Sequence, residues 1–226
     1  MKESTEEMFS RIVGRYDFLN HVMSGGLDIA WRKKLVSVAE PKGGDFVADI
    51  ATGTGDVAFE FAKKGDGIRV VGVDISEEML KIAREKAKRK GFEQVTFRHG
   101  DALQLLLEDN TFDIVTMTFG IRNLPDYEKG LKEMIRVAKK GGKILILEFS
   151  MPMNFFARFL YRLYLKVVVP FFGSVFSERS AYEYLNKSIE EFATVDVVQV
   201  MRSAGLQRVQ RVPLSFGIVS LYAATK

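Results

Sequence analysis

The sequence predicts an α/β protein with a mostly parallel sheet, and two observations support this fold class. Short apolar runs rich in β-branched residues alternate with charged segments of helical periodicity from residue 45 onward, as stacked βαβ units require. A glycine-rich turn follows the first of these runs and leads directly into a helical pattern. The 226 residues, 47% of them apolar, correspond to one domain with an elaboration.

The same patterns predict seven strands, with helices between the parallel ones. Five parallel strands are expected at Phe46–Ile50, Arg69–Asp74, Val95–Arg98, Phe112–Met117 and Lys143–Glu148. Apolar residues recur three and four positions apart in three helical segments, Asp56–Lys63, Glu77–Lys90 and Tyr127–Lys139. C-terminal glycines are expected after the last two of these helices, at Gly91 and Gly141-Gly142. An antiparallel hairpin is predicted at the end of the chain from Leu206–Pro213, the turn Ser215-Phe216-Gly217 and Ile218–Thr225.

We expect a single domain with four segments. Residues 1–44 are expected to form N-terminal helices that fold over the site as a lid. Residues 45–150 are expected to form the cofactor-binding core. Residues 151–196 interrupt the α/β alternation, which indicates a helical insertion that faces substrate or lipid. Residues 197–226 supply the C-terminal strands.

Composition limits the function. The chain has no cysteine, which excludes disulfides, thiolate metal sites and cysteine nucleophiles. Its net charge of +4 and pI near 9.1 are typical of nucleic-acid binding proteins. However, the positive excess lies in residues 151–177 and 197–226, whereas residues 45–150 are slightly acidic. This distribution favours a membrane surface, and we expect no nucleic-acid partner.

The sequence predicts a cytoplasmic protein. Residues 1–7 are acidic and lack the apolar stretch of a secretory signal. The most apolar uncharged run, Val167–Ser177, contains Pro170 and is shorter than the ~20 residues that a spanning helix needs. Attachment to the inner face of the membrane remains open.

Carboxylates surround the glycine-rich turn. Asp49 ends the first strand, and Gly53 and Gly55 together with Ala58 satisfy the G-x-G-x-x-A pattern of dinucleotide binding. Asp56 would repel a pyrophosphate at the N-terminus of the next helix, where anions otherwise bind. S-adenosylmethionine carries a sulfonium and an ammonium but no phosphate. The turn therefore predicts this cofactor in preference to a nicotinamide dinucleotide.

Two further acids lie at the carboxyl ends of the next strands. Asp74 follows Gly55 by 19 residues, where an acid accepts hydrogen bonds from both ribose hydroxyls. After the third strand, the Asp101 carboxylate can accept from an adenine amino group while the Ala102 N–H reaches a ring nitrogen. Because parallel strands direct their carboxyl ends to one crevice, these residues predict a single cofactor site.

With these motifs the chain resembles the class I S-adenosylmethionine-dependent methyltransferases, whose fold is Rossmann-like. More narrowly, from about Phe9 to its end, it resembles the C-methyltransferase family of demethylmenaquinone and ubiquinone biosynthesis. The segments that carry the resemblance are Tyr16-Asp17-Phe18-Leu19-Asn20, Ser24, Gly26, Trp31-Arg32, Ala51-Thr52-Gly53-Thr54-Gly55-Asp56, Phe119-Gly120-Ile121-Arg122-Asn123, Leu147-Glu148-Phe149-Ser150, Tyr184-Leu185 and Ser188-Ile189. It implies methylation of a reduced polyprenyl quinone, demethylmenaquinol to menaquinol.

The resemblance also implies cofactor contacts, namely at Thr54, Asp74, Asp101, Ala102 and Thr118. With the glycine turn, the predicted cofactor site is Asp49, Gly53, Thr54, Gly55, Asp74, Ile75, Asp101, Ala102 and Thr118. Three departures from the family pattern are visible: Leu105-Leu106-Leu107 replaces Leu-Pro-Phe, and Lys140 and Ala193 replace prolines. Only the first departure bears on the wall of the adenine pocket.

The implied reaction needs an activated ring carbon. Methyl transfer is an in-line displacement, and a ring carbon becomes nucleophilic when a hydroquinone hydroxyl loses its proton. Arg122, with Asn123 beside it, is predicted to stabilise the phenolate. Because arginine stays protonated in proteins, the proton acceptor remains open between water, Tyr16, Asp17 and His21. With two histidines and no cysteine, we expect no metal site.

The insertion contains an aromatic helical segment, residues 155–168. Its charged residues, Arg158, Arg162 and Lys166, recur every fourth position and are expected on one helical face. Such a helix can lie among the headgroups of an anionic membrane or roof a pocket for a polyprenyl tail. An ordinary core helix or a homodimer interface is the alternative.

Other functions remain as alternatives. A nucleic-acid methyltransferase acting on base amino groups usually has an Asn-Pro-Pro-aromatic motif where this chain has Thr118-Phe119-Gly120-Ile121. A related methyltransferase acting on another phenol or lipid is not excluded by sequence. A non-catalytic S-adenosylmethionine-binding protein would have no need of Arg122.

Overall fold

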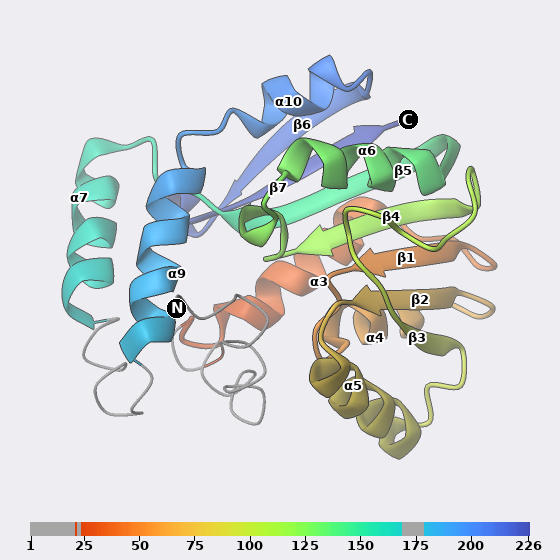
Figure 1. The fold of residues 1–226 in the computed structure, drawn as a ribbon. Coiled ribbons are helices and arrows are strands. Elements are labelled where there is room, and N and C mark those ends of the chain that lie inside the picture. Colours follow the sequence, from red (N-terminus) through yellow and green to blue (C-terminus); the bar gives the residue numbers. More distant parts are fainter. Residues whose placement is uncertain (1–20, 22–23, 169–178) are drawn as a thin grey trace.

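The computed structural model describes residues 21, 24–168 and 179–226, and these form a sheet with helices on both faces (Figure 1). The sheet has seven strands in the order β3-β2-β1-β4-β5-β7-β6. The strands are β1 (Phe46–Ile50), β2 (Arg69–Asp74), β3 (Val95–His99), β4 (Phe112–Thr118), β5 (Ala138–Phe149), β6 (Gln207–Leu214) and β7 (Val219–Thr225). Five strands are parallel, and β7 pairs antiparallel with both β5 and β6. The predicted fold class and hairpin are confirmed.

Helices cover the two faces of the sheet as separate layers. One layer contains α3 (Leu27–Ala39), α4 (Asp56–Ala62) and α5 (Glu77–Lys90), which share a core with alternate residues of the strands. The other contains α6 (Tyr127–Val137) and α10 (Val197–Ser203), which pack on the remaining strand residues. The inner strands β1, β2, β4, β5 and β7 bury residues toward both layers, as the apolar runs of a sheet covered on both sides require.

The helix ends follow the sequence in most places and depart from it in one. Ser76 and Asp126 cap α5 and α6 by accepting from the backbone N–H groups of residues three positions on. Gly91 ends α5 in the left-handed conformation that was predicted, with φ 72°. The prediction for α6 is wrong, because this helix ends at Val137 and Gly141 lies within β5. The chain therefore passes directly from helix to strand without a glycine cap.

Helix α3 belongs to the core. Its buried residues include Trp31, Leu35 and Val36, which pack against the same cluster as α4 and the sheet. The prediction that residues 1–44 form a lid is therefore wrong for α3. For residues 1–20 it stays a prediction, because these lie outside the described residues.

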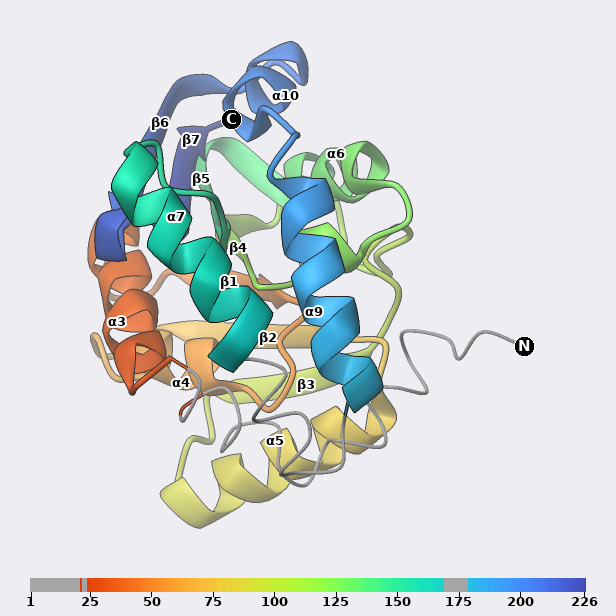
Figure 2. The ribbon, with the colours of Figure 1, turned by 90° about the vertical axis from the view of Figure 1, so that its left-hand side faces the viewer.

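The insertion forms helices beyond the carboxyl ends of the parallel strands (Figure 1). It contains α7 (Phe155–Leu163), a π-helical turn (Tyr164–Val168) and α9 (Arg179–Phe192), and α7 and α9 stand in front of the sheet in Figure 2. The expectation of one regular helix over residues 155–168 is wrong, because α7 changes to the π-helical turn at Tyr164. Among the described residues, no helix has the length and apolar character needed to cross a membrane.

Candidate functional site

The glycine loop between β1 and α4 begins the candidate cofactor site. It is fixed to the neighbouring strand, because the Thr52 N–H donates to the Val73 carbonyl at 3.0 Å. Gly53 and Gly55 both have positive φ, 55° and 87°, which other residues rarely adopt. A Cβ on Gly55 would also lie 2.8 Å from the Phe97 ring. Both conformation and space therefore require glycine at this turn.

Asp74, at the end of β2, holds the loop in position. Its Oδ2 accepts from the Gly53 N–H at 2.8 Å, and its Oδ1 accepts from the Ser76 N–H at 2.9 Å. Burial raises the pKa of this carboxyl. Two carboxylate oxygens offer about four acceptor positions, so capacity for ribose hydroxyls remains. The sequence prediction gave Asp74 a ligand role only, and the structure adds this role in organising the loop.

Asp49 is the most deeply buried carboxyl of the site. Only 1% of it is exposed, and its Oδ2 accepts from the Thr52 hydroxyl at 2.6 Å. No hydrogen-bond partner of its buried Oδ1 is found among the described residues. Burial raises the pKa of Asp49 to about 7, with the nearby Asp74 as a smaller cause in the same direction.

Two buried threonine hydroxyls of β4, one of them beside Asp49, also have no hydrogen-bond partner within the described residues. Thr116 is paired with Asp49 across β1 and β4, and Thr118 lies at the end of β4. The Oγ1 atoms of both threonines make no hydrogen bond. Because buried polar groups nearly always have partners, orphan atoms beside the glycine loop fit a polar, cationic ligand. The predicted cofactor residues Asp49 and Thr118 thus fit S-adenosylmethionine.

The surroundings of Asp56 differ from the expectation, because two cationic side chains lie beside its carboxylate. Its Oδ1 lies 3.0 Å from Lys86 Nζ, which also donates to the Thr54 hydroxyl at 2.9 Å. Arg32 lies 3.7 Å from the other carboxylate oxygen. Lys86 and Arg32 therefore offset the negative charge that was expected to repel a pyrophosphate. Repulsion by Asp56 therefore does not exclude a dinucleotide at this turn, contrary to the prediction.

The adenine side of the predicted site is more open. Asp101 is exposed and accepts from the Leu103 N–H at 2.8 Å, which orders the turn that contains Ala102. Ile75, beyond β2, exposes 46% of its surface. An acid, a backbone N–H and an uncovered apolar side chain are the groups that an adenine ring requires. The positions of Ile75, Asp101 and Ala102 are thus compatible with the predicted adenine contacts.

Arg122 lies in a short 3₁₀ turn (Ile121–Asn123) after β4 and is only 6% exposed. Its Nη1 donates to Glu148 Oε1 and to the Phe119 carbonyl, both at 2.8 Å, and its Nε donates to the Ser188 hydroxyl at 3.3 Å. Nη2 is the end of the guanidinium for which no partner is found among the described residues. The cation is thus fixed in place with one donor group still available.

Glu148 was not predicted as a site residue, although it lies within a motif that carries the family resemblance. It is fully buried at the end of β5, and burial raises its pKa while the adjacent Arg122 opposes this change. The pairing of Glu148 with Arg122 is not visible in the sequence, because the two residues are 26 positions apart and meet only through the β4–β5 pairing.

The other predicted catalytic residues have different surroundings. Asn123 Nδ2 donates to the Phe119 carbonyl at 3.3 Å, and its Oδ1 accepts from the Tyr184 hydroxyl at 3.2 Å. His21 pairs with Asp28 at 3.1 Å, and half of its side chain is exposed. It is thereby linked to the start of α3 and has no contact with Arg122. Tyr16 and Asp17 lie outside the described residues.

The strand order, the glycine loop and the acids at successive strand ends together define a class I S-adenosylmethionine-dependent methyltransferase with a Rossmann-like fold. A methyltransferase from Thermotoga maritima, described as a possible histamine N-methyltransferase, superposes with a TM-score of 0.68 at 25% identity. The match covers 97% of this chain and 98% of that one. An S-adenosylmethionine-dependent methyltransferase from Aquifex aeolicus gives a TM-score of 0.64 at 22% identity, over 86% and 88% of the two chains.

Sequence comparison narrows the class to one family. The model of the ubiE/COQ5 methyltransferase family matches residues 1–226, and the chain belongs to this family. A demethylmenaquinone methyltransferase of Bacteroides fragilis is 41% identical over 99% of this chain and 93% of its own length. That of Thermus thermophilus is 40% identical over 97% of this chain and its entire length. The predicted family, enzyme class and cofactor are confirmed.

Proposed function

We propose that this enzyme methylates a ring carbon of demethylmenaquinol with S-adenosylmethionine as the methyl donor. The observation that carries the proposal is the buried Arg122, held at the end of β4 by Glu148 and Ser188 with one donor group available. Full-length similarity to demethylmenaquinone methyltransferases supports the choice of ring.

The proposed role of Arg122 follows from the chemistry of the ring. When bound, S-adenosylmethionine supplies an electrophilic methyl group on a sulfonium. A hydroquinone carbon reacts with it readily only when a ring oxygen carries negative charge. The free Nη2 of Arg122 can donate to that oxygen, and its burial strengthens the interaction because water does not compete. Asn123 and Tyr184 are proposed to shape the same wall of the site.

The cofactor is proposed to lie along the carboxyl ends of β1 to β4. Asp49 and Thr118 would take its polar methionine portion, since both have buried atoms in need of partners. Asp74 would take the ribose, and Ile75 with the Asp101–Ala102 pair would take the adenine. The backbone of Gly53, Thr54 and Gly55 would line the space between them.

Incubation with labelled S-adenosylmethionine and chemically reduced demethylmenaquinol tests the activity. Mass analysis should show one added methyl group on a ring carbon, and the oxidised quinone should give no product. Parallel reactions with a benzoquinol and with bulk tRNA separate the alternatives. Transfer of label to tRNA but not to quinol would overturn the proposal.

We propose further that the enzyme works at the cytoplasmic face of a membrane, with α7 as the contact. The apolar face of α7 and the π-helical turn is uncovered, with Phe155 85%, Phe156 67% and Phe159 57% exposed. The other residues of this face are Leu160, Leu163 and Val167. Such a face, next to arginines, fits the interface between lipid headgroups and acyl chains, where a polyprenyl substrate resides.

Flotation with vesicles tests the membrane contact. Replacing Phe155 and Phe159 by serine should abolish vesicle binding while methyl transfer to a short-tailed quinol continues. Leu106→Ser, which changes an 81% exposed leucine in the loop after β3, serves as the matched control and should bind as the wild type does. If the serine variant instead dissociates a homodimer that does not bind vesicles, the proposed membrane contact is wrong.

A further inference from the structure

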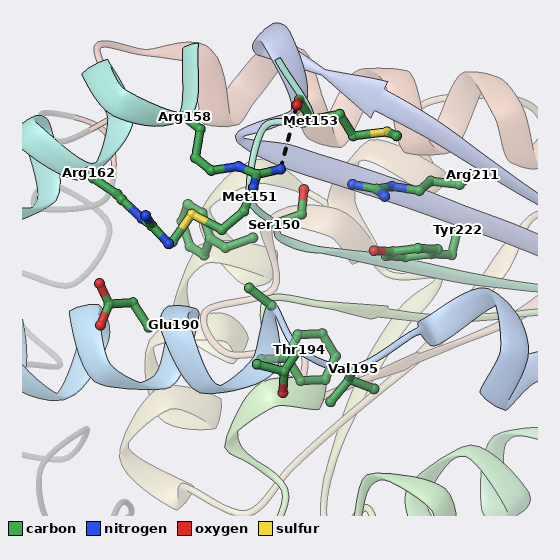
Figure 3. Close-up of a pocket in the computed structure, with 13 residues that line it drawn as sticks. Ser150, Met151, Met153, Arg158, Arg162, Glu190, Thr194, Val195, Arg211 and Tyr222 are labelled. Atoms are coloured by element: carbon green, nitrogen blue, oxygen red, sulfur yellow. Dashed lines mark hydrogen bonds between the residues drawn. The ribbon is translucent and has the colours of Figure 1, made fainter. Parts of the chain in front are cut away.

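A cavity of about 470 Å³ lies outside the site described above, between α7, the end of α9 and the sheet edge formed by β5, β7 and β6. Figure 3 shows its lining, with α7 on one side and the strands on the other. Three arginines line it, Arg158 and Arg162 from α7 and Arg211 from β6. Glu190 of α9 is the single acid in the lining. The proposed methyl-transfer reaction makes no use of this basic cavity.

The expected basic face of the helix is therefore directed into a cavity, and the apolar face is the uncovered one. Arg158 and Arg162 line the cavity, and Arg162 is exposed to solvent as well, whereas Phe155 and Phe159 of the same helix are exposed outside the cavity. Lys166 lies beyond the end of α7, in the π-helical turn, and does not line the cavity. The prediction that the three basic residues lie on one face of a single helix is therefore wrong for Lys166.

Arg158 and Arg211 are held by hydrogen bonds, and neither forms an ion pair with any residue that the structure describes. Arg158 Nε donates to the Pro152 carbonyl at 2.8 Å, and Arg211 Nε donates to the Ser220 hydroxyl at 2.9 Å. The Arg211 guanidinium also lies 6.0 Å from the centre of the Tyr222 ring. In Figure 3, Arg158 and Arg211 reach toward each other from opposite sides of the cavity.

Arg162 completes the positive lining. No hydrogen bond or ion pair of its side chain is found within the described part of the chain, and Figure 3 shows it extending toward Glu190. Three guanidinium groups that face one space repel one another unless an anion lies between them. One glutamate does not balance the charge of three guanidinium groups, and this excess of positive charge favours a ligand with negative charge in the cavity.

We propose that this cavity binds the phosphate of an anionic phospholipid, an inference that rests on the proposed membrane contact of α7. A phosphate presents oxygens in several directions and can be reached by guanidinium groups from opposite sides, whereas a carboxylate presents only two oxygens in one plane. With the apolar face of α7 in the interface, the cavity on the adjacent face of that helix would lie at headgroup level. The exposed Met153 at its rim is available to an acyl chain.

Glu190 allows a test in which phosphate binding should become tighter instead of weaker. Its carboxylate lines the same cavity and would repel a phosphate, so it opposes binding by the arginines. Glu190→Gln should therefore tighten phosphate binding, whereas loss of an arginine should weaken it. A cavity that is merely a gap between helices would respond to neither change.

Titration of the purified enzyme with short-chain phosphatidylglycerol, kept below its micelle concentration, measures the site without a membrane. The wild type should bind one lipid, and the double variant Arg162→Gln/Arg211→Gln should lose roughly tenfold in affinity for each arginine. The matched control, Lys166→Gln/Arg208→Gln, removes one charge from the π-helical turn after α7 and one from β6 but spares the cavity. It should bind the lipid as the wild type does.

Three further results would overturn the inference. Equal loss in the two double variants would show diffuse attraction rather than a site. Inorganic phosphate binding as tightly as the lipid would identify a site for free phosphate. Absence of binding to phosphatidylglycerol, in an enzyme that still methylates quinol and floats with vesicles, would refute the cavity while leaving the proposed function intact. If the proposed function fails instead, flotation or methyl transfer is lost while the soluble lipid still binds.

Discussion

Arg122 and Glu148 form a buried ion pair in which each residue depends on the other. The glutamate is fully buried and the arginine nearly so, and removing either one leaves an uncompensated charge. Glu148 makes a second hydrogen bond through the Phe149 N–H at 2.8 Å, which fixes the carboxylate to β5. The pair therefore sets the direction of the guanidinium, and we interpret Glu148 as a positioning residue.

Substitutions at this pair should separate catalysis from cofactor binding. Arg122→Ala should lower kcat by at least about a hundredfold, because the charge on the ring oxygen loses its stabilising donor. Glu148→Gln should lower kcat by roughly ten- to a hundredfold, through loss of a charged hydrogen bond that orients the arginine. In both variants the Kd for S-adenosylmethionine, measured by calorimetry, should stay near the wild-type value.

Folding must be controlled in that comparison, since an unpaired buried charge destabilises. The double variant Arg122→Ala/Glu148→Gln removes both charges, so it should unfold at a higher temperature than Arg122→Ala and remain inactive. Normal turnover in Arg122→Ala would contradict the proposed role of this residue in stabilising the charged ring oxygen.

Asp49 links stability to pH. Since burial raises its pKa from an ordinary 3.8 to about 7, the folded protein retains a proton that the unfolded chain has already lost above about pH 4. The contribution of this group to stability is therefore complete at low pH and is lost as the pH rises to 7. Above that, the folded protein carries a buried anion.

Asp49→Asn should remove this dependence. At about pH 8 the variant should be more stable than the wild type, by a few kcal/mol at most, and the difference should vanish near pH 4. Urea unfolding at several pH values measures it. The same variant should bind S-adenosylmethionine more weakly, because the cationic ligand loses its buried carboxylate. A variant with the wild-type pH profile would contradict the assigned pKa.

At the scale of elements, the glycine loop depends on how closely β2 approaches its neighbours. A Cβ on Gly72, in the middle of β2, would lie 2.7 Å from the Phe97 ring and 2.8 Å from the Thr52 hydroxyl. That hydroxyl is the donor to Asp49. The strand therefore has a glycine where the floor of the site requires space.

Gly72→Ala should destabilise the protein by about 1–3 kcal/mol through overpacking and should weaken cofactor binding as well. Thermal unfolding and calorimetry measure the two effects. Gly65→Ala is the matched control, because its added Cβ would meet only the flexible end of Ile68 at 3.6 Å. Equal unfolding temperatures and equal cofactor affinities of the two variants would show that the close approach at Gly72 does not limit stability or binding.

The insertion shows how tertiary contacts assign the faces of a helix. Residues 155–163 form the expected helix, capped by Asn154, whose side chain accepts from the Ala157 N–H at 3.0 Å. Its buried side is Tyr161, followed by Leu165 in the π-helical turn, and both pack on Ile189 of α9. With that side against α9, the arginines enter the cavity and the phenylalanines remain uncovered.

At the scale of the whole molecule, cofactor binding should stabilise the fold. The site draws residues from four strand ends, so a ligand that binds only the folded state raises the unfolding temperature. S-adenosylmethionine at about a hundred times its Kd should add roughly 2.7 kcal/mol, or about 5–10 °C for a domain of this size.

NAD at the same concentration is the comparison, and it should give no shift. Lys86 and Arg32 offset the charge of Asp56, so the charge at the turn does not by itself exclude a dinucleotide. The comparison with NAD tests that exclusion directly. A larger shift with NAD than with S-adenosylmethionine would contradict the assigned cofactor.

The sequence by itself determined the α/β class, the glycine loop, the acids that follow the strands and the strand ranges apart from the start of β5, which lies at Ala138 and not at the predicted Lys143. These depend on local periodicity, turn chemistry and the rule that parallel strands end at one edge, all of which are properties of short segments. The resemblance to a quinone methyltransferase family was likewise carried by short motifs, and the family match confirms it.

Only the tertiary structure decided what each charged residue faces. Arg122 meets Glu148 across neighbouring strands, Asp56 meets Lys86 across two helices, and Arg158 turns from the expected membrane face into a cavity. The members of the two ion pairs lie about 30 positions apart in the sequence. Arg158 lines the cavity because the side of its helix that contains Tyr161 packs on α9. Spacing along the chain carries no information about either, because electrostatic energy depends on distance in space and on exposure to water.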